Sequence, residues 1–259
     1  MMGSFTFPDL GTAVERCIMR GRQGIGCTMA FIDVPARDGA RIRLAASHYQ
    51  ACIDRLGALG LRAGVTIKPS LLGAHFDDRL CEETALGLAE AAGEADVRFE
   101  IATEGRGTVD LAIRIARSCS EVINEPLIDL QVGLERTAGD LSALIDAGIV
   151  PRLVKGAYAN ELGDRSLVQA RFREMAQAII DSGRTLVIGT HDPELLDWSR
   201  GAVSGREKLE CGFLMGVAEG TMAEMAGGGW QVTEYVPYGT NVQQYVARRM
   251  AEQEARRRP

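Results

Sequence analysis

The sequence has few of the residues from which metal sites and disulfide frameworks are built. It contains three histidines, and its six cysteines lie far apart with no CxxC pair. Zinc sites need Cys or His ligands at short, regular spacing, so we expect no metal ion. The start, MMGSFTFPDL, has neither a basic segment nor a long apolar stretch. Scattered thiols without a signal peptide are typical of the reducing cytoplasm.

A basic surface and a membrane-spanning run are missing as well. The formal net charge is −6, and general nucleic-acid binders need a basic face, so we do not expect that class of protein. No segment approaches the roughly 20 apolar residues that cross a bilayer. The basic run Arg256–Arg258 is interpreted as the solvated end of a helix.

What the chain does have is enough apolar sequence for one large core. It is 259 residues long and 46% hydrophobic, a size that a single domain reaches. Its 30 glycines separate regularly spaced apolar runs, which indicates frequent turns rather than disorder. No strong domain boundary is visible, so we expect one domain over residues 1–259.

Strand-like runs alternate with helix-compatible stretches along the whole chain. Two of these stretches, Arg41–Gly60 and Ser166–Gly183, end in glycine, a common stop signal for helices. Parallel neighbouring strands need such crossover connections, so the alternation predicts a parallel sheet. The strand-like runs are Gly26–Val34, Ala63–Leu71, Asp96–Ala102, Leu127–Leu134, Pro151–Tyr158, Thr185–His191, Leu209–Met215 and Trp230–Gly239.

Eight such units in a chain of this length suit a closed (β/α)8 TIM-like barrel. An open doubly wound sheet is the alternative. It is less favoured because no GxGxxG motif follows the first strand, and the GIG at Gly24–Gly26 comes before it. The residues before Gly24 predict a short N-terminal helix, which we expect to cover the base of the barrel.

Polar residues gather at the predicted carboxyl ends of the strands, where such barrels carry their active sites. Together they predict a pocket with cations, a carboxylate and aromatic hydroxyls. The residues are Lys68, Glu100 or Glu104, Gln131, Arg152, Lys155, Tyr158, Thr190, His191, Leu214 and Tyr235.

Two of these cations have open interpretations. Lys68 is either a surface lysine at a strand end or a buried one that faces an acid or an anionic ligand. Arg152 lies within a strand and needs a partner if it is buried. Its planar donor fork suits a carboxylate, a phosphate or the polar edge of a ring cofactor. A structural ion pair is the alternative.

The last predicted helix carries an unusual stripe. Tyr245, Arg248, Arg249 and Glu252 fall at i, i+3, i+4 and i+7 and share one face. The spacing alone favours a solvent face. However, the helix follows YVPYG at the end of the last strand, so it begins beside the barrel mouth. The stripe is alternatively the wall of a polar pocket, where two arginines hold a carboxylate through bidentate hydrogen bonds.

Taken together, these motifs resemble the proline dehydrogenase family of FAD-dependent barrel enzymes. The matching stretches are VTIKPSLLG, TVDLAI, LQVGLERTAGDL, RLVKGAY, IGTHD, LECGFLMGV and YVPYGTNVQQYVARRMAE. They occur in family order from roughly Gly24 to Glu252. The resemblance implies a distorted (β/α)8 barrel, FAD as cofactor and the single-function bacterial form of the enzyme.

The resemblance also implies a role for individual residues on the flavin side. Arg152 matches an arginine near flavin N5, and Gln131 matches a glutamine that contacts the flavin ring. The flavin-binding segment corresponds to Val154, Lys155, Gly156 and Ala157, and a further cofactor-binding pair corresponds to Thr190 and His191.

On the substrate side, Arg248 and Arg249 match the pair that binds the proline carboxylate, and Glu252 matches an acid that supports them. Lys68 matches a lysine beneath the substrate. The residues implied to enclose the substrate ring are Tyr158, Leu214, Tyr235 and Tyr245.

The implied reaction is oxidation of L-proline by hydride transfer to flavin N5, which gives Δ1-pyrroline-5-carboxylate. The family further implies a quinone as electron acceptor and peripheral contact with the inner face of a membrane. We do not assign the general base. Oligomeric state is left open.

The sequence departs from the family in the acid after the third strand, where FEIATEGRG replaces a run with an aspartate. Glu100 fills this place if the stretch is aligned from the left, and Glu104 if it is aligned from the right. Cys211-Gly212 replaces a Phe-Gln pair. These differences keep open the oxidation of another cyclic or secondary amino acid. A lyase or aldolase that forms a Schiff base on Lys68 or Lys155, and a non-catalytic binding protein, are the remaining alternatives.

Overall fold

Eight parallel strands form a closed barrel in the computed structural model, which describes residues 5–156 and 161–257. Each strand of this part of the chain pairs with the next, and β8 pairs with β1 to complete the ring. The predicted (β/α)8 barrel is therefore confirmed, and the open sheet is excluded. The strands are β1 Gly26–Phe31, β2 Ala63–Ile67, β3 Arg98–Ile101, β4 Leu127–Gln131, β5 Val150–Val154, β6 Leu186–Gly189, β7 Leu209–Leu214 and β8 Gln231–Tyr238.

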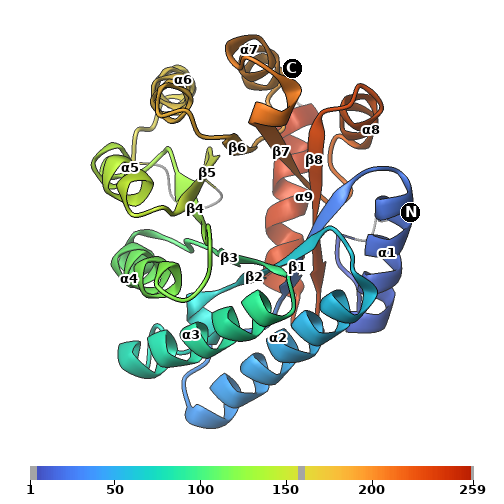
Figure 1. The fold of residues 1–259 in the computed structure, drawn as a ribbon, viewed down its shortest axis with the longest axis vertical. Coiled ribbons are helices and arrows are strands. Elements are labelled where there is room, and N and C mark those ends of the chain that lie inside the picture. Colours follow the sequence, from blue (N-terminus) through green and yellow to red (C-terminus); the bar gives the residue numbers. More distant parts are fainter. Residues whose placement is uncertain (1–4, 157–160, 258–259) are drawn as a thin grey trace.

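Helices follow the strands and surround the barrel (Figure 1). The two predicted helical stretches correspond to α2 and α6. Asp38 caps the first turn of α2 by accepting a hydrogen bond from the Arg41 backbone N–H, and Gly60 ends the helix at φ 55°. The helices are α1 Leu10–Arg22, α2 Gly39–Leu59, α3 Asp78–Glu94, α4 Val109–Ser120, α5 Thr137–Asp146, α6 Arg165–Asp181, α7 Pro193–Ala202, α8 Glu219–Gly227 and α9 Gln243–Arg257.

The inside of the barrel is polar, and the hydrophobic core lies outside it. Alternate residues of a strand point to opposite faces. On β1, Met29 and Phe31 belong to the main core, together with Tyr49 of α2. The intervening Thr28 instead donates a hydrogen bond to Glu100 of β3 at 2.9 Å, so it faces inward. The interior of the barrel can therefore hold charged side chains.

The first and last helices depart from a regular barrel. Helix α1 packs against β1 and β8 and stands in the outer ring between α8 and α2 (Figure 1). The expectation that it covers the base of the barrel is therefore wrong. Helix α9, which follows β8, does not take this place. It lies within the ring of outer helices (Figure 1). Tyr245 of α9 and Ala30 of β1 belong to one hydrophobic cluster.

Charged groups hold α1 in its place. Arg16 and Arg20 of α1 each donate two hydrogen bonds to the carboxylate of Glu234 on β8, at distances of 2.8–3.0 Å. Both arginines also pair with Glu219 at the start of α8. Glu234 is fully buried. Burial favours its neutral form, but the hydrogen bonds from both arginines outweigh burial and keep the pKa of Glu234 below its usual value.

We predict that Glu234→Gln destabilises the protein by about 3–5 kcal/mol, because it leaves two arginines facing a neutral amide. Urea unfolding at pH 7 measures this loss. Glu224→Gln, at an exposed position of α8, is the matched control and should change stability by less than about 0.5 kcal/mol.

The stability difference between the wild type and Glu234→Gln should also change at acidic pH. A carboxyl group whose pKa is depressed on folding contributes its full stability above the unfolded value, about 4.3 for Glu. That contribution disappears as the pH falls through the lower folded value. The stability gap between the wild type and Glu234→Gln should therefore narrow below about pH 4. A gap that stays constant down to pH 2 would contradict this assignment.

Candidate active site

The predicted site residues surround the carboxyl ends of the strands. Gln131 and Leu214 are the last residues of β4 and β7, while Lys68 follows β2 and Thr190 follows β6. Because all eight strands are parallel, these ends meet at one mouth of the barrel. Tyr235 is an exception to the prediction, since it lies within β8 rather than at its end.

Glu104, rather than Glu100, lies beside Lys68. The carboxylate of Glu104 accepts hydrogen bonds from the backbone N–H and the hydroxyl of Ser70, both at 2.8 Å. The Lys68 Nζ is 4.0 Å from Glu104 Oε1, and both side chains are largely buried. Lys68 is therefore not a solvated surface lysine. It faces an acid at the mouth, which is the second of the two interpretations that the sequence allowed for Lys68.

Glu100 lies deeper, inside the barrel. Arg152 donates from both terminal nitrogens to the two Glu100 oxygens, at 2.7 and 2.9 Å. Thr28 and Thr66 donate to the same carboxylate at 2.9 and 2.8 Å. Burial raises the pKa of Glu100, but the charges of Arg152 and Arg98 and these hydrogen bonds outweigh burial and lower it to about 2. Glu100 is therefore ionised at neutral pH.

The Glu100 pair does not satisfy Arg152 completely. Arg152 is 7% exposed, and among the described residues no acceptor hydrogen-bonds to its buried Nε. Two inward-facing glycines, Gly189 and Gly212, stand next to it: a Cβ on Gly189 would lie 3.5 Å from Arg152 Cδ, and one on Gly212 would lie 3.7 Å from Nε. The arginine is thus a buried donor that a bound acceptor would complete.

The segment after β5 approaches the mouth with its backbone. Gly156 has φ +113°, which favours glycine, and a Cβ there would lie 3.3 Å from Gln131 Oε1. The amide of Gln131 donates to the Thr103 carbonyl at 3.0 Å. Val154, at the end of β5, is half-buried. A ligand at this position would therefore meet main-chain groups and the Gln131 side chain.

Lys155 and the residues after β6 form one connected group. Lys155 Nζ donates to Asp192 at 2.9 Å, and the Asp192 backbone N–H donates to the Thr190 hydroxyl at 3.1 Å. His191 accepts a hydrogen bond from the Leu214 backbone N–H at 2.9 Å. Burial opposes ionisation of Asp192, but hydrogen bonds from Lys155 and Gln169 lower its pKa to about 2. Lys155 thus faces a permanent negative charge.

The arginine-bearing face of α9 turns toward the barrel. Tyr245 and Arg249 are both 6% exposed, and Arg248 is half-buried. The Tyr245 ring lies 5.5 Å from the Arg249 guanidinium and 6.4 Å from the Tyr235 ring. The solvent-face interpretation is therefore wrong for Tyr245 and Arg249, while the pocket-wall interpretation stays a prediction. The remaining predicted residues, Ala157, Tyr158 and the side chain of Glu252, lie outside the described part of the chain.

Asp129 is a residue that the sequence reasoning missed. It lies on β4 two residues before Gln131, in register with Arg152 on β5. Its carboxylate is 3.5 Å from Arg152 Nη1. A charged residue on the inward face of a strand, two positions before a predicted site residue, was the signal that could have identified it.

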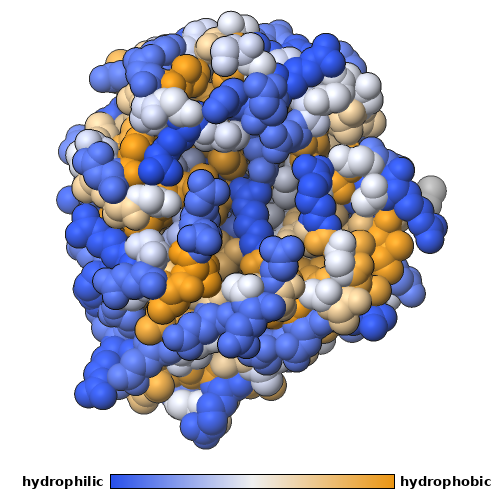
Figure 2. All heavy atoms as spheres, in the orientation of Figure 1, coloured by the Kyte–Doolittle hydropathy of each residue, from blue (hydrophilic) through white to orange (hydrophobic). Residues whose placement is uncertain are grey.

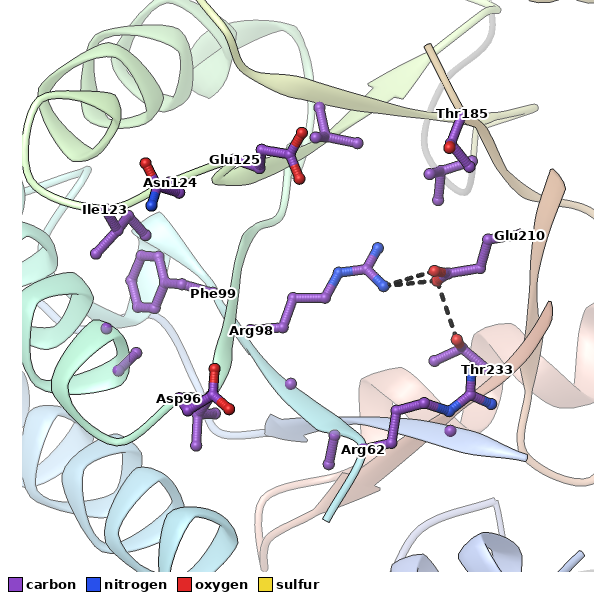
Figure 3. A pocket seen from close by; sticks show the side chains of 18 of the residues that line it. Arg62, Asp96, Arg98, Phe99, Ile123, Asn124, Glu125, Thr185, Glu210 and Thr233 are labelled. Atoms are coloured by element: carbon purple, nitrogen blue, oxygen red, sulfur yellow. Dashed lines mark hydrogen bonds and ion pairs between the residues drawn. The ribbon is translucent and has the colours of Figure 1, made fainter. Parts of the chain in front are cut away.

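A cavity lies at the opposite end of the barrel, away from the predicted residues at the carboxyl ends of the strands. It has a volume of about 1300 Å³. Figure 3 shows Arg98 pointing to Glu210, with hydrogen bonds of 2.7 Å, and Thr233 donating to the same acid. Its lining has as many acidic as basic residues, namely Asp96, Glu121, Glu125 and Glu210 against Arg62, Arg98, Arg184 and Lys208.

The surface adds little to this picture. In Figure 2 hydrophilic side chains cover most of the visible face, and apolar residues form separate patches between them. Within residues 5–156 and 161–257, His, Cys, Asp and Glu side chains do not gather in threes as a metal site requires. Among the helices of the same residues, none combines the length and apolar character needed to cross a bilayer. All six cysteines are buried free thiols.

In sequence, the chain is similar to curated proteins that are all named proline dehydrogenase. Proline dehydrogenase 1 of Bacillus subtilis (strain 168) is 23% identical over 252 residues, which cover 94% of this chain and 83% of the relative. Proline dehydrogenase of Deinococcus radiodurans is 27% identical over 238 residues, or 86% of this chain and 74% of the relative. No protein-family model matches the chain.

Solved structures show the same fold. Proline utilization A (PutA) of Bdellovibrio bacteriovorus, inactivated by N-propargylglycine, superposes with a TM-score of 0.88 at 16% identity and covers 97% of this chain. A PutA mutant of Bradyrhizobium japonicum superposes with a TM-score of 0.81 at 19% identity over 97% of this chain. This chain spans about a third of their length, 32% and 30%. Relatives in sequence and neighbours in fold agree: the chain is similar in sequence to proline dehydrogenases and shares its barrel fold with PutA proteins.

Proposed function

We propose that this protein oxidises L-proline to Δ1-pyrroline-5-carboxylate, with FAD as the hydride acceptor and residues 1–259 as one domain. The buried arginine face of α9 at the barrel mouth is the observation that carries the proposal. Two adjacent arginines present planar donor groups that suit bidentate hydrogen bonds to a substrate carboxylate. The names of the curated relatives support proline as the substrate.

The residues near Arg152 fit a flavin. Its buried Nε lacks an acceptor among the described residues, and a flavin ring carries polar acceptor atoms along one edge. Bound FAD supplies the chemistry of accepting a hydride. Arg152 and Gln131 would lie against its ring, together with the main chain around Gly156. The other residues expected to hold it are Val154, Lys155, Ala157, Thr190 and His191.

Arg248 and Arg249 would hold the proline carboxylate from α9. Two fixed cations orient the ring and remove rotational freedom from the barrier to reaction. Tyr235, Tyr245 and Leu214 would form the apolar walls, since they belong to or border one hydrophobic cluster at the mouth. Tyr158 and the acid Glu252 complete the proposed set.

Lys68 and Glu104 would set the charge on the other side of the substrate. The proline nitrogen must lose its ammonium proton before a hydride can leave the adjacent carbon, because a positively charged nitrogen cannot donate electrons. Lys68 with its acid partner 4.0 Å away lies at the same mouth. Glu100, which holds Arg152 from below, contributes by positioning that arginine. We assign no single general base.

The alternatives find less support. A Schiff-base lysine must be neutral to attack a carbonyl, yet Lys155 donates to Asp192 at 2.9 Å and Lys68 faces Glu104. Gly212, whose replacement of a larger residue raised the question of another amino-acid substrate, stands beside Arg152 rather than beside Tyr245. Its effect therefore falls on the cofactor side. We further propose a quinone as the final electron acceptor, reached by a cytoplasmic protein in peripheral contact with a membrane.

The visible spectrum of the purified protein tests this function directly. We expect bands near about 380 and 450 nm from oxidised flavin, and bleaching after anaerobic addition of L-proline. A flavin spectrum that stays unchanged with proline would contradict the substrate but not the cofactor. A protein that remains colourless after incubation with FAD would overturn the whole proposal.

Arg249→Lys tests the carboxylate clamp. Lysine keeps the charge but loses the planar fork, which removes hydrogen bonds to a charged group, each worth about 1.5–3 kcal/mol. We expect KM for L-proline to rise roughly 10- to 150-fold, with flavin content unchanged. Arg117→Lys, at an exposed position of α4, is the control. An unchanged KM in Arg249→Lys would remove Arg249 from the binding site.

A further inference from the structure

Asp129 occupies an unusual position for a carboxylate. It belongs to the inward face of β4, one strand from Arg152 and two residues below Gln131. Although it lies inside the barrel, 22% of its side-chain surface is accessible, against 8% for Arg152 and 1% for Glu100. Asp129 is therefore the most exposed of these three charged side chains, and it lies on the strand that ends in Gln131.

Two carboxylates contact the guanidinium of Arg152, and Asp129 is the second of them after Glu100. Glu100 takes both terminal nitrogens of Arg152 at 2.7 and 2.9 Å. Asp129 has a longer contact of 3.5 Å with one of them. One cation thus faces two acids, and Glu100 has the better geometry of the two.

The other charged groups near this pair come from neighbouring strands. Arg98 of β3 has its Nε 3.3 Å from Glu100 Oε1. Glu210 of β7 lies 3.9 Å from Arg152 Nη2. Lys68, after β2, acts on Asp129 through its charge. The inward residues of β6 beside Arg152, Val187 and Gly189, carry no charge.

The two acids on Arg152 hold their protons very differently. Burial raises the pKa of Asp129, the charge of Glu100 raises it further, and Arg152 and Lys68 act in the opposite direction, with a net value of about 6. The pKa of Glu100 is about 2. Between pH 5 and 7 the carboxyl group of Asp129 therefore changes charge while Glu100 stays ionised.

We infer that Asp129 is a positioning residue that acts through Arg152 and sets the charge beside the flavin, so that the flavin accepts electrons more readily when Asp129 is protonated. The inference rests on the proposed function. A flavin held beside Arg152 would gain a negative charge on accepting a hydride, because a hydride carries two electrons and one proton. A negative Asp129 opposes that charge, and a neutral one does not.

The sign of the pH dependence follows from this argument. Below about pH 6 Asp129 already carries its proton before reduction. Above that pH the negative reduced flavin raises the affinity of Asp129 for a proton, so the protein takes one additional proton from solvent on reduction. The midpoint potential of the wild type should therefore fall more steeply with pH just above pH 6 than below it.

Asp129→Asn tests the inference, because the amide has the same shape and lacks the charge. We would measure the flavin midpoint potential by equilibration with reference dyes from pH 5 to 8. The variant should match the wild type at pH 5 and show a more positive potential at pH 8. Asp146→Asn, which removes the same charge from an exposed position at the end of α5, should follow the wild type throughout.

The outcomes separate this inference from the proposed function. If proline bleaches the flavin but Asp129→Asn and wild type have the same potential at pH 5 and pH 8, the inference is overturned and the function stands. If the wild type takes up no flavin, both fall. Should the variant not fold, the wild-type curve decides alone: a slope that is constant from pH 5 to 8 overturns the inference, and a steeper slope above pH 6 supports it.

Discussion

The guanidinium of Arg152 and the carboxylate of Glu100 face each other in the middle of the barrel, where water cannot solvate either as it does outside. Removing two charges from water costs several kcal/mol for each ion, and the pair is tolerated only if every remaining donor and acceptor is satisfied. Thr28 and Thr66 satisfy the carboxylate. Among the described residues the Nε of Arg152 has no hydrogen-bond acceptor, and the proposed flavin would supply one.

The residues between the Arg152–Glu100 pair and the mouth are arranged around this pair. Gly189 and Gly212 are neighbours of Arg152: a Cβ on either would touch its side chain, at 3.5 Å from Cδ and 3.7 Å from Nε. Gln131 and Gly156 continue the same side of the mouth, and α9 lies across from them with its tyrosine and arginines. Because α9 is drawn to the mouth, the outer ring lacks the helix that would follow β8, and α1 fills that place. The position of α9 therefore accounts both for the tyrosine and arginines at the mouth and for the irregular outer ring of helices.

The eight strands and, apart from Tyr235, the polar residues near their ends could be predicted from sequence, because apolar runs and glycine stops are local patterns. The orientation of α9 could not, since a period of 3.6 residues tells which side chains share a face but not what that face meets. The choice between Glu100 and Glu104 also needed three dimensions: it depends on Ser70 and Lys68 for one acid and on Arg152 for the other. Asp129 was not predicted because an inward side chain in the middle of a strand ordinarily packs in the interior of the barrel and not at the active site.

The place of α1 has a consequence for how the molecule is made. Arg16 lies 218 residues before its partner Glu234, so the charges of α1 are matched only when two distant parts of the chain have come together. Contacts of such long sequence separation form late, because they require the intervening chain to be already compact. Among the neighbouring strands of the described residues, β8 and β1 are the farthest apart in the chain, so we expect their seam to close last. Since α9 continues from β8, we expect the mouth to take its final shape only after that seam has closed.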